Sequence, residues 1–327
     1  ATVAGTDTLT FVGEAGAMTL HPASDQVRFT PGSVQQVVLE PTGPLTLTAG
    51  SSITLTATGR DGYGNPVDPW SPITYAWRQA SAPGGAGYGV LSSAAPYSRS
   101  VRFTPQRVGA NQVWATGAAL TSNVLAITVL NGPAALASAM VEPASVPADG
   151  VTPFVITLTQ VTDAFSNVVP DGTPLTITVA SNPPRVAVVN TANGAAVGHF
   201  TAGLDAGQHA VTVVGPDGPL ALTGATSVQF LAGTPIQAVV SAWPTTLPAD
   251  GASTTVITVT VSDGQSNPVR DGTPITVTTT LGTLSGGSAA TVNGIVTRTL
   301  RAPVALGTAT FVVESPNGNL DVSGDTV

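Results

Sequence analysis

One stretch decides the fold, and over residues 248–300 it reads PADGASTTVITVTVSDGQSNPVRDGTPITVTTTLGTLSGGSAATVNGIVTRTL. In its first half apolar and polar residues alternate: Ile257, Val259 and Val261 fall on one face, and the threonines between them fall on the other. Alternation with a period of two is typical of a β-strand that buries one face. The sequence therefore predicts a strand here, covered on one side by the rest of a small domain.

A second copy of this stretch lies about 100 residues earlier in the chain. Pro147-Ala148-Asp149-Gly150 corresponds to Pro248-Ala249-Asp250-Gly251, and an alternating run follows each of them. The earlier run holds one residue more than its counterpart. An extra residue in one strand of a pair forms a β-bulge. We therefore expect a bulge at or near Gln160, which returns Val161 to the core face.

Turn motifs recur at the same places in both copies. Asp and Asn side chains hydrogen-bond to their own backbone in tight turns, and Gly adopts positive φ without steric cost. An Asn-Gly pair between two strands predicts a tight hairpin. The recurring motifs are Asp163-x-x-x-Asn167 and Asp263-x-x-x-Asn267, Asp171-Gly172-Thr173-Pro174 and Asp271-Gly272-Thr273-Pro274, and Asn193-Gly194 and Asn293-Gly294.

The repeat extends over the whole chain. A junction motif that begins with glycine recurs at Gly32, Gly132 and Gly233, and a period of about 100 residues is the size of one domain. We expect a window of a longer array, in which the first segment supplies the last two strands of a preceding domain. The predicted segments are 1–32, 33–132, 133–233 and 234–327.

The motifs in residues 248–300 resemble the bacterial immunoglobulin-like (Big) domains of the invasin and intimin type. The resemblance is strongest in 234–327, good in 133–233 and weaker in 33–132. It implies two-sheet Greek-key sandwiches carried in tandem on extracellular adhesins, and it supplies no active site. Short strands and frequent turn signals independently favour an all-β protein of tandem immunoglobulin-like Greek-key β-sandwiches, which we expect to be arranged as a rod.

Composition excludes several classes of function. Cysteine is absent, and all ten basic residues are arginine, so neither a disulfide nor a lysine-based cross-link can form. The net charge of −8 argues against nucleic acid as a partner. No run of 18 apolar residues occurs, which predicts no membrane span. No nucleophile motif is present, and the chain is predicted not to be an enzyme, with no catalytic and no cofactor-binding residues.

Calcium is the more serious candidate ligand. Six aspartates in predicted loops offer the oxygen ligands that calcium prefers, yet each belongs to a turn motif, and a role in the turn is favoured over metal binding. They are Asp149, Asp163, Asp171, Asp250, Asp263 and Asp271. Two histidines of one repeat, His199 and His209, could face each other on neighbouring strands, but no third ligand accompanies them, and His21 lies in another segment. We therefore predict no metal site.

Aromatic residues gather in the 33–132 segment, beside a glycine-rich stretch. A glycan-contacting surface within residues 63–107 is one hypothesis, and packing in the core or at an interface is the other. Trp77 lies where an immunoglobulin-type sandwich often places its core tryptophan. The aromatic residues considered for a surface are Tyr63, Trp70, Tyr88, Tyr97, Trp114 and Trp243.

The leading functional prediction is a non-enzymatic stalk or filament segment of an extracellular bacterial surface protein. Its partners would be other copies of itself or other surface proteins. The alternatives are a segment that binds a host or glycan ligand directly, and a subunit of a self-assembling filament or surface layer that uses lateral contacts or strand exchange. What covers Leu9, Phe11, Val27 and Phe29 would distinguish them, because a two-stranded hairpin is not stable alone.

Overall fold

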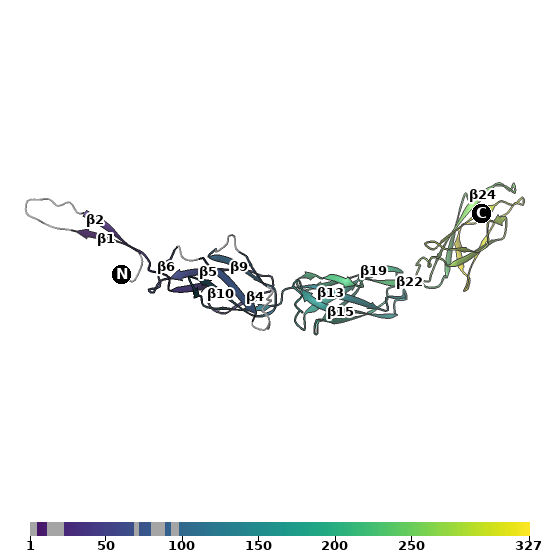
Figure 1. The fold of residues 1–327 in the computed structure, drawn as a ribbon. Coiled ribbons are helices and arrows are strands. Elements are labelled where there is room, and N and C mark those ends of the chain that lie inside the picture. Colours follow the sequence, from purple (N-terminus) through teal and green to yellow (C-terminus); the bar gives the residue numbers. More distant parts are fainter. Residues whose placement is uncertain (1–4, 12–22, 69–71, 80–88, 93–97) are drawn as a thin grey trace, which may run out of the picture. The chain divides into compact units, whose positions relative to one another are not determined.

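The structure is a computed structural model, and it describes residues 5–11, 23–68, 72–79, 89–92 and 98–327. The chain divides into two compact units. The first contains residues 1–133 together with 163–169, and the second contains 134–162 and 170–327. Every regular element in the described residues is a β-strand (Figure 1). The predicted all-β fold class is confirmed.

The first sandwich, which we define as strands β3 to β12, lies in the first unit. Alternating residues of both sheets point inward, and the buried core includes Leu39, Leu55, Phe103 and Ile127. One sheet has the order β3-β5-β9-β8, with β6 beside β5; the other runs β11-β10-β12-β4, with β7 beside β10. The strands are β3 (Gln36–Glu40), β4 (Leu45–Thr48), β5 (Ile53–Arg60), β6 (Pro66–Val67), β7 (Thr74–Gln79), β8 (Gly89–Ser92), β9 (Ser100–Pro105), β10 (Gly109–Gly117), β11 (Leu120–Thr121) and β12 (Leu125–Leu130).

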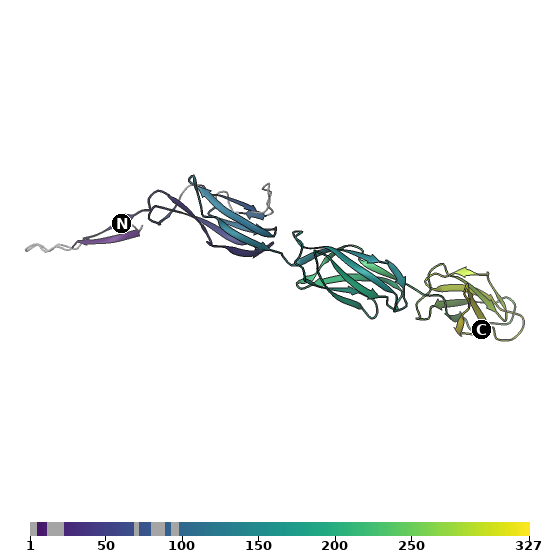
Figure 2. The ribbon, with the colours of Figure 1, turned by 90° about the horizontal axis from the view of Figure 1, so that it is seen from below.

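The second sandwich comprises β13 to β22, coloured teal to green in Figures 1 and 2. Its sheets have the orders β18-β15-β13-β21 and β14-β22-β19-β16-β17, with β20 beside β19. Phe154 and Phe230 meet edge to face between them, with ring centroids 5.8 Å apart. The strands are β13 (Ala134–Glu142), β14 (Ser145–Pro147), β15 (Pro153–Asp163), β16 (Pro174–Val179), β17 (Arg185–Asn190), β18 (Ala196–Thr201), β19 (Gly207–Gly215), β20 (Gly218–Pro219), β21 (Ala221–Gly224) and β22 (Ser227–Leu231).

The third sandwich comprises β23 to β31. Its sheets have the orders β26-β28-β24-β23-β31 and β27-β25-β29-β30. The predicted core residues Ile257, Val259 and Val261 are fully buried on β24. The strands are β23 (Gln237–Trp243), β24 (Thr254–Ser262), β25 (Pro274–Thr279), β26 (Thr283–Leu284), β27 (Ala289–Ala290), β28 (Ile295–Arg301), β29 (Phe311–Ser315), β30 (Gly318–Asn319) and β31 (Asp321–Gly324).

The predicted bulge is present in β15. Gln160 has φ of 52°. Thr159 and Gln160 are both exposed, so two exposed residues in a row shift the alternation by one position. Val161 is fully buried. An extra residue in the left-handed region bends the strand and restores the inward phase, as expected for a bulge.

The two Asn-Gly turns are present, but neither joins a hairpin, because β17 and β18 lie in opposite sheets and so do β27 and β28. Asn193 and Gly194 have φ of 50° and 71°, and Asn293 and Gly294 have 51° and 74°. Positive φ at both central residues is the type I′ geometry, whose twist matches the twist of paired strands. Bridges between the flanking residues close both turns.

The strands β1 (Gly5–Phe11) and β2 (Ala23–Phe29) form an antiparallel pair at the start of the first unit. Gly5 is opposite Phe29 in this pair, as Gly207 is opposite Phe230 in the pair of β19 and β22. The two antiparallel strand pairs therefore share one register. Phe29 is partly exposed, and the side chains of Leu9, Phe11 and Val27 lie outside the described residues.

Candidate functional site: the Asp-x-x-x-Asn loops

The two Asp-x-x-x-Asn motifs fold into the same local structure. Oδ1 of Asp163 accepts hydrogen bonds from the backbone N–H groups of Phe165, at 2.8 Å, and Asn167, at 2.9 Å. Oδ1 of Asp263 accepts from Gln265 and Asn267, both at 2.9 Å. A carboxylate that caps the backbone two and four residues ahead fixes the turn, as the sequence predicts.

The second carboxylate oxygen reaches the junction glycine. Oδ2 of Asp163 accepts from the N–H of Gly132 at 3.0 Å, and Oδ2 of Asp263 accepts from the N–H of Gly233 at 2.8 Å. The loop is therefore tied to the point where the chain leaves the preceding repeat. The recurring glycine and the recurring aspartate, far apart in sequence, are two parts of one structure.

The asparagine of each loop clamps the backbone of the preceding repeat. Nδ2 of Asn167 donates to the carbonyl of Gln106 at 2.7 Å, and Oδ1 accepts from the N–H of Val108 at 3.2 Å. Asn267 does the same, with the carbonyl of Leu204 and the N–H of Ala206, both at 2.8 Å.

This pattern uses the full hydrogen-bonding capacity of the amide nitrogen. The second Nδ2 hydrogen goes to the aspartate of the same loop, at 2.8 Å for Asn167 and 3.0 Å for Asn267. An amide offers two donors and one oxygen acceptor, so each group of the side chain has a partner. We call this arrangement the asparagine clamp.

Both aspartates are almost completely buried. Burial alone would raise their pKa values, because it disfavours the charged form. The hydrogen bonds from the asparagine side chain, the backbone N–H groups and the junction glycine outweigh burial, and the pKa values of Asp163 and Asp263 are lowered. Each carboxylate is therefore a stable, charged centre of its loop.

A third copy of the loop occurs in the first sandwich. Asp61 caps the N–H groups of Tyr63 and Asn65, and its Oδ2 accepts from Gly32 at 3.0 Å. Hydrogen bonds from Asn65 and the Gly32 N–H lower the pKa of Asp61 to about 2. All three junction glycines thus meet an aspartate.

The loop at 163–169 has contacts that its counterpart lacks. Phe165 packs against the hydrophobic core of the first sandwich, where a side chain at Gly50 would overlap its ring. Asn131 donates to the carbonyl of Val168, and Arg107 reaches the carbonyl of Ser166 at 3.5 Å. Gln265, which replaces the phenylalanine in the later loop, is exposed. The sequence predicted both turns but neither the clamp nor the phenylalanine contact.

The other candidate calcium ligands serve their own turns. Oδ1 of Asp149 accepts hydrogen bonds from the N–H groups of Val151 and Thr152. Oδ1 of Asp250 accepts from the N–H groups of Ala252 and Ser253 in the same way. Asp171 and Asp271 each accept the backbone N–H of an Asn-Gly turn, at 2.6 Å. In the part of the chain that the structure describes, no three His, Asp or Glu side chains come together as metal ligands would.

The histidines do not form a pair. His199 is exposed on β18, and His209 is buried on β19, a strand of the opposite sheet. The hypothesis that they face each other on neighbouring strands is wrong, because the chain crosses between the sheets after β18. His21 lies outside the described residues.

The aromatic candidates are dispersed. Tyr63 and Trp243 are 73% and 82% exposed, and the guanidinium of Arg78 lies 5.8 Å from the ring of Trp114. Trp70, Tyr88, Tyr97 and the side chain of Trp77 lie outside the described residues, which leaves the glycan surface and the core tryptophan as predictions.

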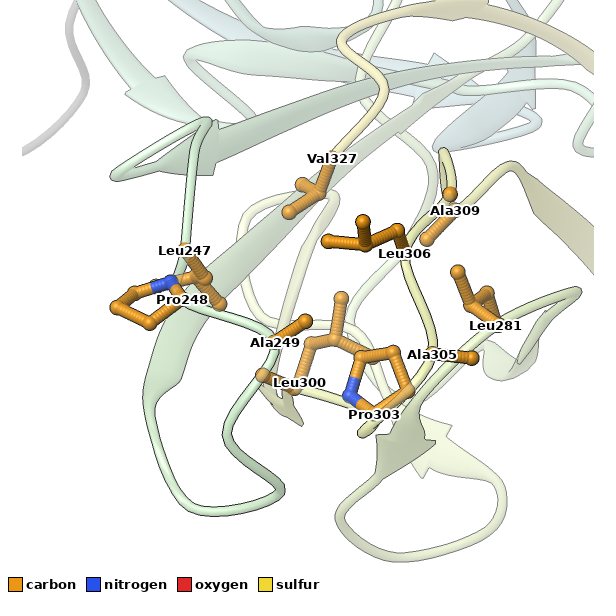
Figure 3. Close-up of a pocket in the computed structure, with 12 residues that line it drawn as sticks. Leu247, Pro248, Ala249, Leu281, Leu300, Pro303, Ala305, Leu306, Ala309 and Val327 are labelled. Carbon is orange, nitrogen blue, oxygen red and sulfur yellow. The ribbon is translucent and has the colours of Figure 1, made fainter.

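A pocket opens at one end of the third sandwich (Figure 3). All twelve residues around it are apolar or glycine, and four leucines supply its largest side chains: Leu247, Leu281, Leu300 and Leu306. It offers no acid, base or nucleophile. Across the described residues, no helix is long and apolar enough to cross a membrane.

A comparison with known families matches one domain of the chain. Residues 234–327 match the family model of invasin domain 3, which covers the third sandwich. No curated protein matches the chain.

Several solved structures are similar to the chain. FdeC, an adhesin of Escherichia coli, is 21% identical, with 90% of this chain and 100% of that chain covered and a TM-score of 0.36. Invasin, a bacterial integrin-binding protein, is 15% identical, with 89% and 60% covered and a TM-score of 0.43. InvD of Yersinia pseudotuberculosis is 16% identical, with 89% and 95% covered and a TM-score of 0.36. The chain thus spans 60% of the length of the invasin structure.

The family match agrees with the resemblance that the sequence predicts for residues 234–327. Over residues 234–327, which form the third sandwich, the chain therefore matches the invasin domain 3 family.

Proposed function

We propose that the chain is a stalk segment whose domain junctions are held by the asparagine clamps. The boundaries of the proposed domains are 1–32, 33–132, 133–233 and 234–327. The β1–β2 and β19–β22 strand pairs share one register, which aligns residues 1–32 with the closing strands of a domain and so supports the 1–32 boundary. The junction glycines at 32, 132 and 233 mark the other limits.

The clamp is the observation that carries this proposal. Short linkers alone leave neighbouring domains free to reorient, since interfaces between domains within a chain are commonly small and polar. Asn267 adds two hydrogen bonds from one buried side chain to the backbone of Leu204 and Ala206. Buried, fully satisfied hydrogen-bond networks fix one geometry. A stalk needs this property, because it must present what it carries at a constant distance from the cell.

The experiment uses the absence of cysteine from the chain. Spin labels are placed at Thr212→Cys on the second sandwich and Thr260→Cys on the third, both at exposed positions. We expect a narrow distance distribution by pulsed electron paramagnetic resonance, and a broad one after Asn267→Ala. Asn317→Ala, which removes an exposed asparagine from the third sandwich, is the matched control. A distribution equally broad with and without Asn267 would contradict the proposal.

Direct ligand binding is the second candidate. Invasin is a bacterial integrin-binding protein, and in this chain the exposed side chains of Tyr63 and Arg78 support a surface within residues 63–107. Direct ligand binding would be favoured if the chain binds immobilised integrin or glycans and if Tyr63→Ala lowers the amount bound. Self-assembly into a filament is tested by sedimentation over a wide concentration range, where a constant monomer mass argues against it.

A further inference from the structure

The buried imidazole of His209 lies beside the backbone that Asn267 clamps. It is the third residue of β19, two residues after Gly207, and only 8% of its surface is exposed. Nε2 is 2.9 Å from the carbonyl oxygen of Asp205, and Nδ1 is 3.2 Å from the carbonyl oxygen of Ala180. Asp205 is the residue between Leu204 and Ala206, whose backbone groups bind Asn267.

Both ring nitrogens therefore face oxygen atoms that only accept hydrogen bonds. A neutral imidazole has one N–H, so it satisfies one carbonyl and turns a lone pair toward the other, whereas an imidazolium donates to both. Two further features favour the charged form. The Asp205 carboxylate is 3.7 Å from Nδ1, and the ring of Phe230 lies with its centroid 4.5 Å away, within the range of cation–π attraction.

The other charged groups at this end of the sandwich are Arg185, Asp205 and Asp263. Arg185, on β17, donates from Nη2 to the carbonyl of Ala202. Asp263 is occupied by its own loop and the Gly233 N–H. Asp205 also accepts the N–H of Asn182. His209 is thus the buried group here whose two ring nitrogens both face carbonyl oxygens.

The first sandwich provides an internal control. Its residue two positions after the corresponding glycine, Gly109, is Asn111, which is buried and donates from Nδ2 to the Gly109 carbonyl. The Asn111 amide carries no charge at any of these pH values. It lies beside Val108, the residue whose N–H donates to the clamp asparagine Asn167. The two clamps are alike, but the residue beside each clamped segment differs.

We propose that His209 makes the Asn267 clamp dependent on pH, through protonation that holds the 204–206 segment in place. The inference rests on the proposed stalk function. The sign follows from the geometry: the imidazolium satisfies both carbonyls, so the clamp is strong at acidic pH and weakens as the pH rises and the proton is lost. The junction in the first unit, which relies on Asn111, keeps its strength over the same range.

The test compares two matched amides by NMR hydrogen exchange in the full chain. The N–H groups of Ala206 and Val108 both donate to the Oδ1 of a clamp asparagine. After correction for intrinsic exchange, we expect the protection of Ala206 relative to Val108 to fall by about tenfold between pH 5 and 8, the factor for one lost charge-assisted hydrogen bond. His209→Asn, which copies Asn111, should remove this pH dependence.

Two outcomes would overturn the inference. One is a ratio of Ala206 to Val108 protection that stays constant from pH 5 to 8 in the unsubstituted chain, a measurement that does not depend on any variant folding. The other is a pH dependence that persists in His209→Asn. The stalk function fails separately, if Asn267→Ala leaves the protection of Ala206 at pH 5 unchanged.

Discussion

The loop at 163–169 and the loop at 263–269 share a clamp but differ in the apolar contact beside it. In both, an aspartate binds the junction glycine and an asparagine binds the backbone of the preceding repeat. Phe165 adds an apolar contact with the core of the first sandwich, whereas Gln265 is exposed. The compact first unit includes residues 163–169, while residues 263–269 belong to the second unit with their own sandwich.

This difference separates two ways of holding a junction. Hydrogen bonds fix the geometry, because they act only over a narrow range of distance and angle. Apolar burial adds free energy with little directional preference. The first unit uses both, and the second relies on the hydrogen bonds. The following predictions test this division, from the largest expected effect to the smallest.

Asp163→Ala and Asp263→Ala should cause the largest losses. Each removes a buried carboxylate that accepts four hydrogen bonds and leaves the clamp asparagine without its partner. We expect about 3–5 kcal/mol of destabilisation in either unit, measured by calorimetric unfolding. Asp271→Ala, at an exposed turn, is the control. A large loss in one loop alone would show that the shared clamp is not equivalent in the two.

Phe165→Ala should separate the two loops. Loss of a partly buried phenylalanine costs roughly 2–3 kcal/mol, less than the full value for a core ring. Gln265→Ala should change the unfolding free energy by under about 0.5 kcal/mol, because the side chain is exposed. Equal effects of the two substitutions would mean that the apolar contact adds nothing to the junction.

Asn167→Ala and Asn267→Ala should each cost about 1–2 kcal/mol, since they remove hydrogen bonds to groups that remain buried. The readout is exchange of the Val108 and Ala206 amides. The fractional loss of protection should be larger at Ala206, where no phenylalanine supports the loop. The reverse order would contradict the division between clamp and apolar contact.

Lowering the pH from 7 to 4 should leave the aspartates of both loops charged. Hydrogen bonding lowers the pKa values of Asp163 and Asp263 below the ordinary 3.8 and brings those of Asp149 and Asp250 to about 2. A carboxylate whose pKa is lowered by folding stabilises the fold at pH values above its unfolded pKa, and it loses this contribution as the pH falls toward its folded pKa. In the His209→Asn chain, where the aspartates act without the histidine, the melting temperature should therefore stay nearly constant down to pH 4 and fall below it. A decline that begins above pH 5 would show that other groups control acid stability.

Calcium should have no effect at either junction. Each loop aspartate is engaged by its own turn, so no oxygen cluster is available for the ion. Melting temperatures in excess calcium and in chelator should coincide. A higher melting temperature in calcium would revive the junction site that the sequence left open.

Much of the fold could be predicted from the chain because its signals are local. The alternation around Ile257, the bulge before Val161 and the tight turns at the Asn-Gly pairs depend on neighbours a few residues away, and all three are present. The hairpins expected at the Asn-Gly pairs did not form, because strand pairing depends on sheet order. The pairing of His199 with His209 failed because facing across strands depends on sheet order, which local patterns do not contain.

The clamp shows the same limit at the candidate site. The sequence marks Asp163 and Asn167 as a turn, since the aspartate binds backbone within its own loop. It does not reveal that the asparagine reaches Gln106 and Val108, some 60 residues away. The fixed recurrence of this asparagine about 35 residues after each junction glycine was the available signal.

The sequence by itself determined strands, turns and the repeat, because those follow from residue order and steric preference. Only the tertiary structure decided which backbone groups Asn167 and Asn267 bind, that Phe165 packs on a neighbouring core, and that His209 faces two carbonyls. These are contacts between distant segments. Their partners are set by how the sheets pack, and backbone acceptors carry no side-chain identity that a sequence could display.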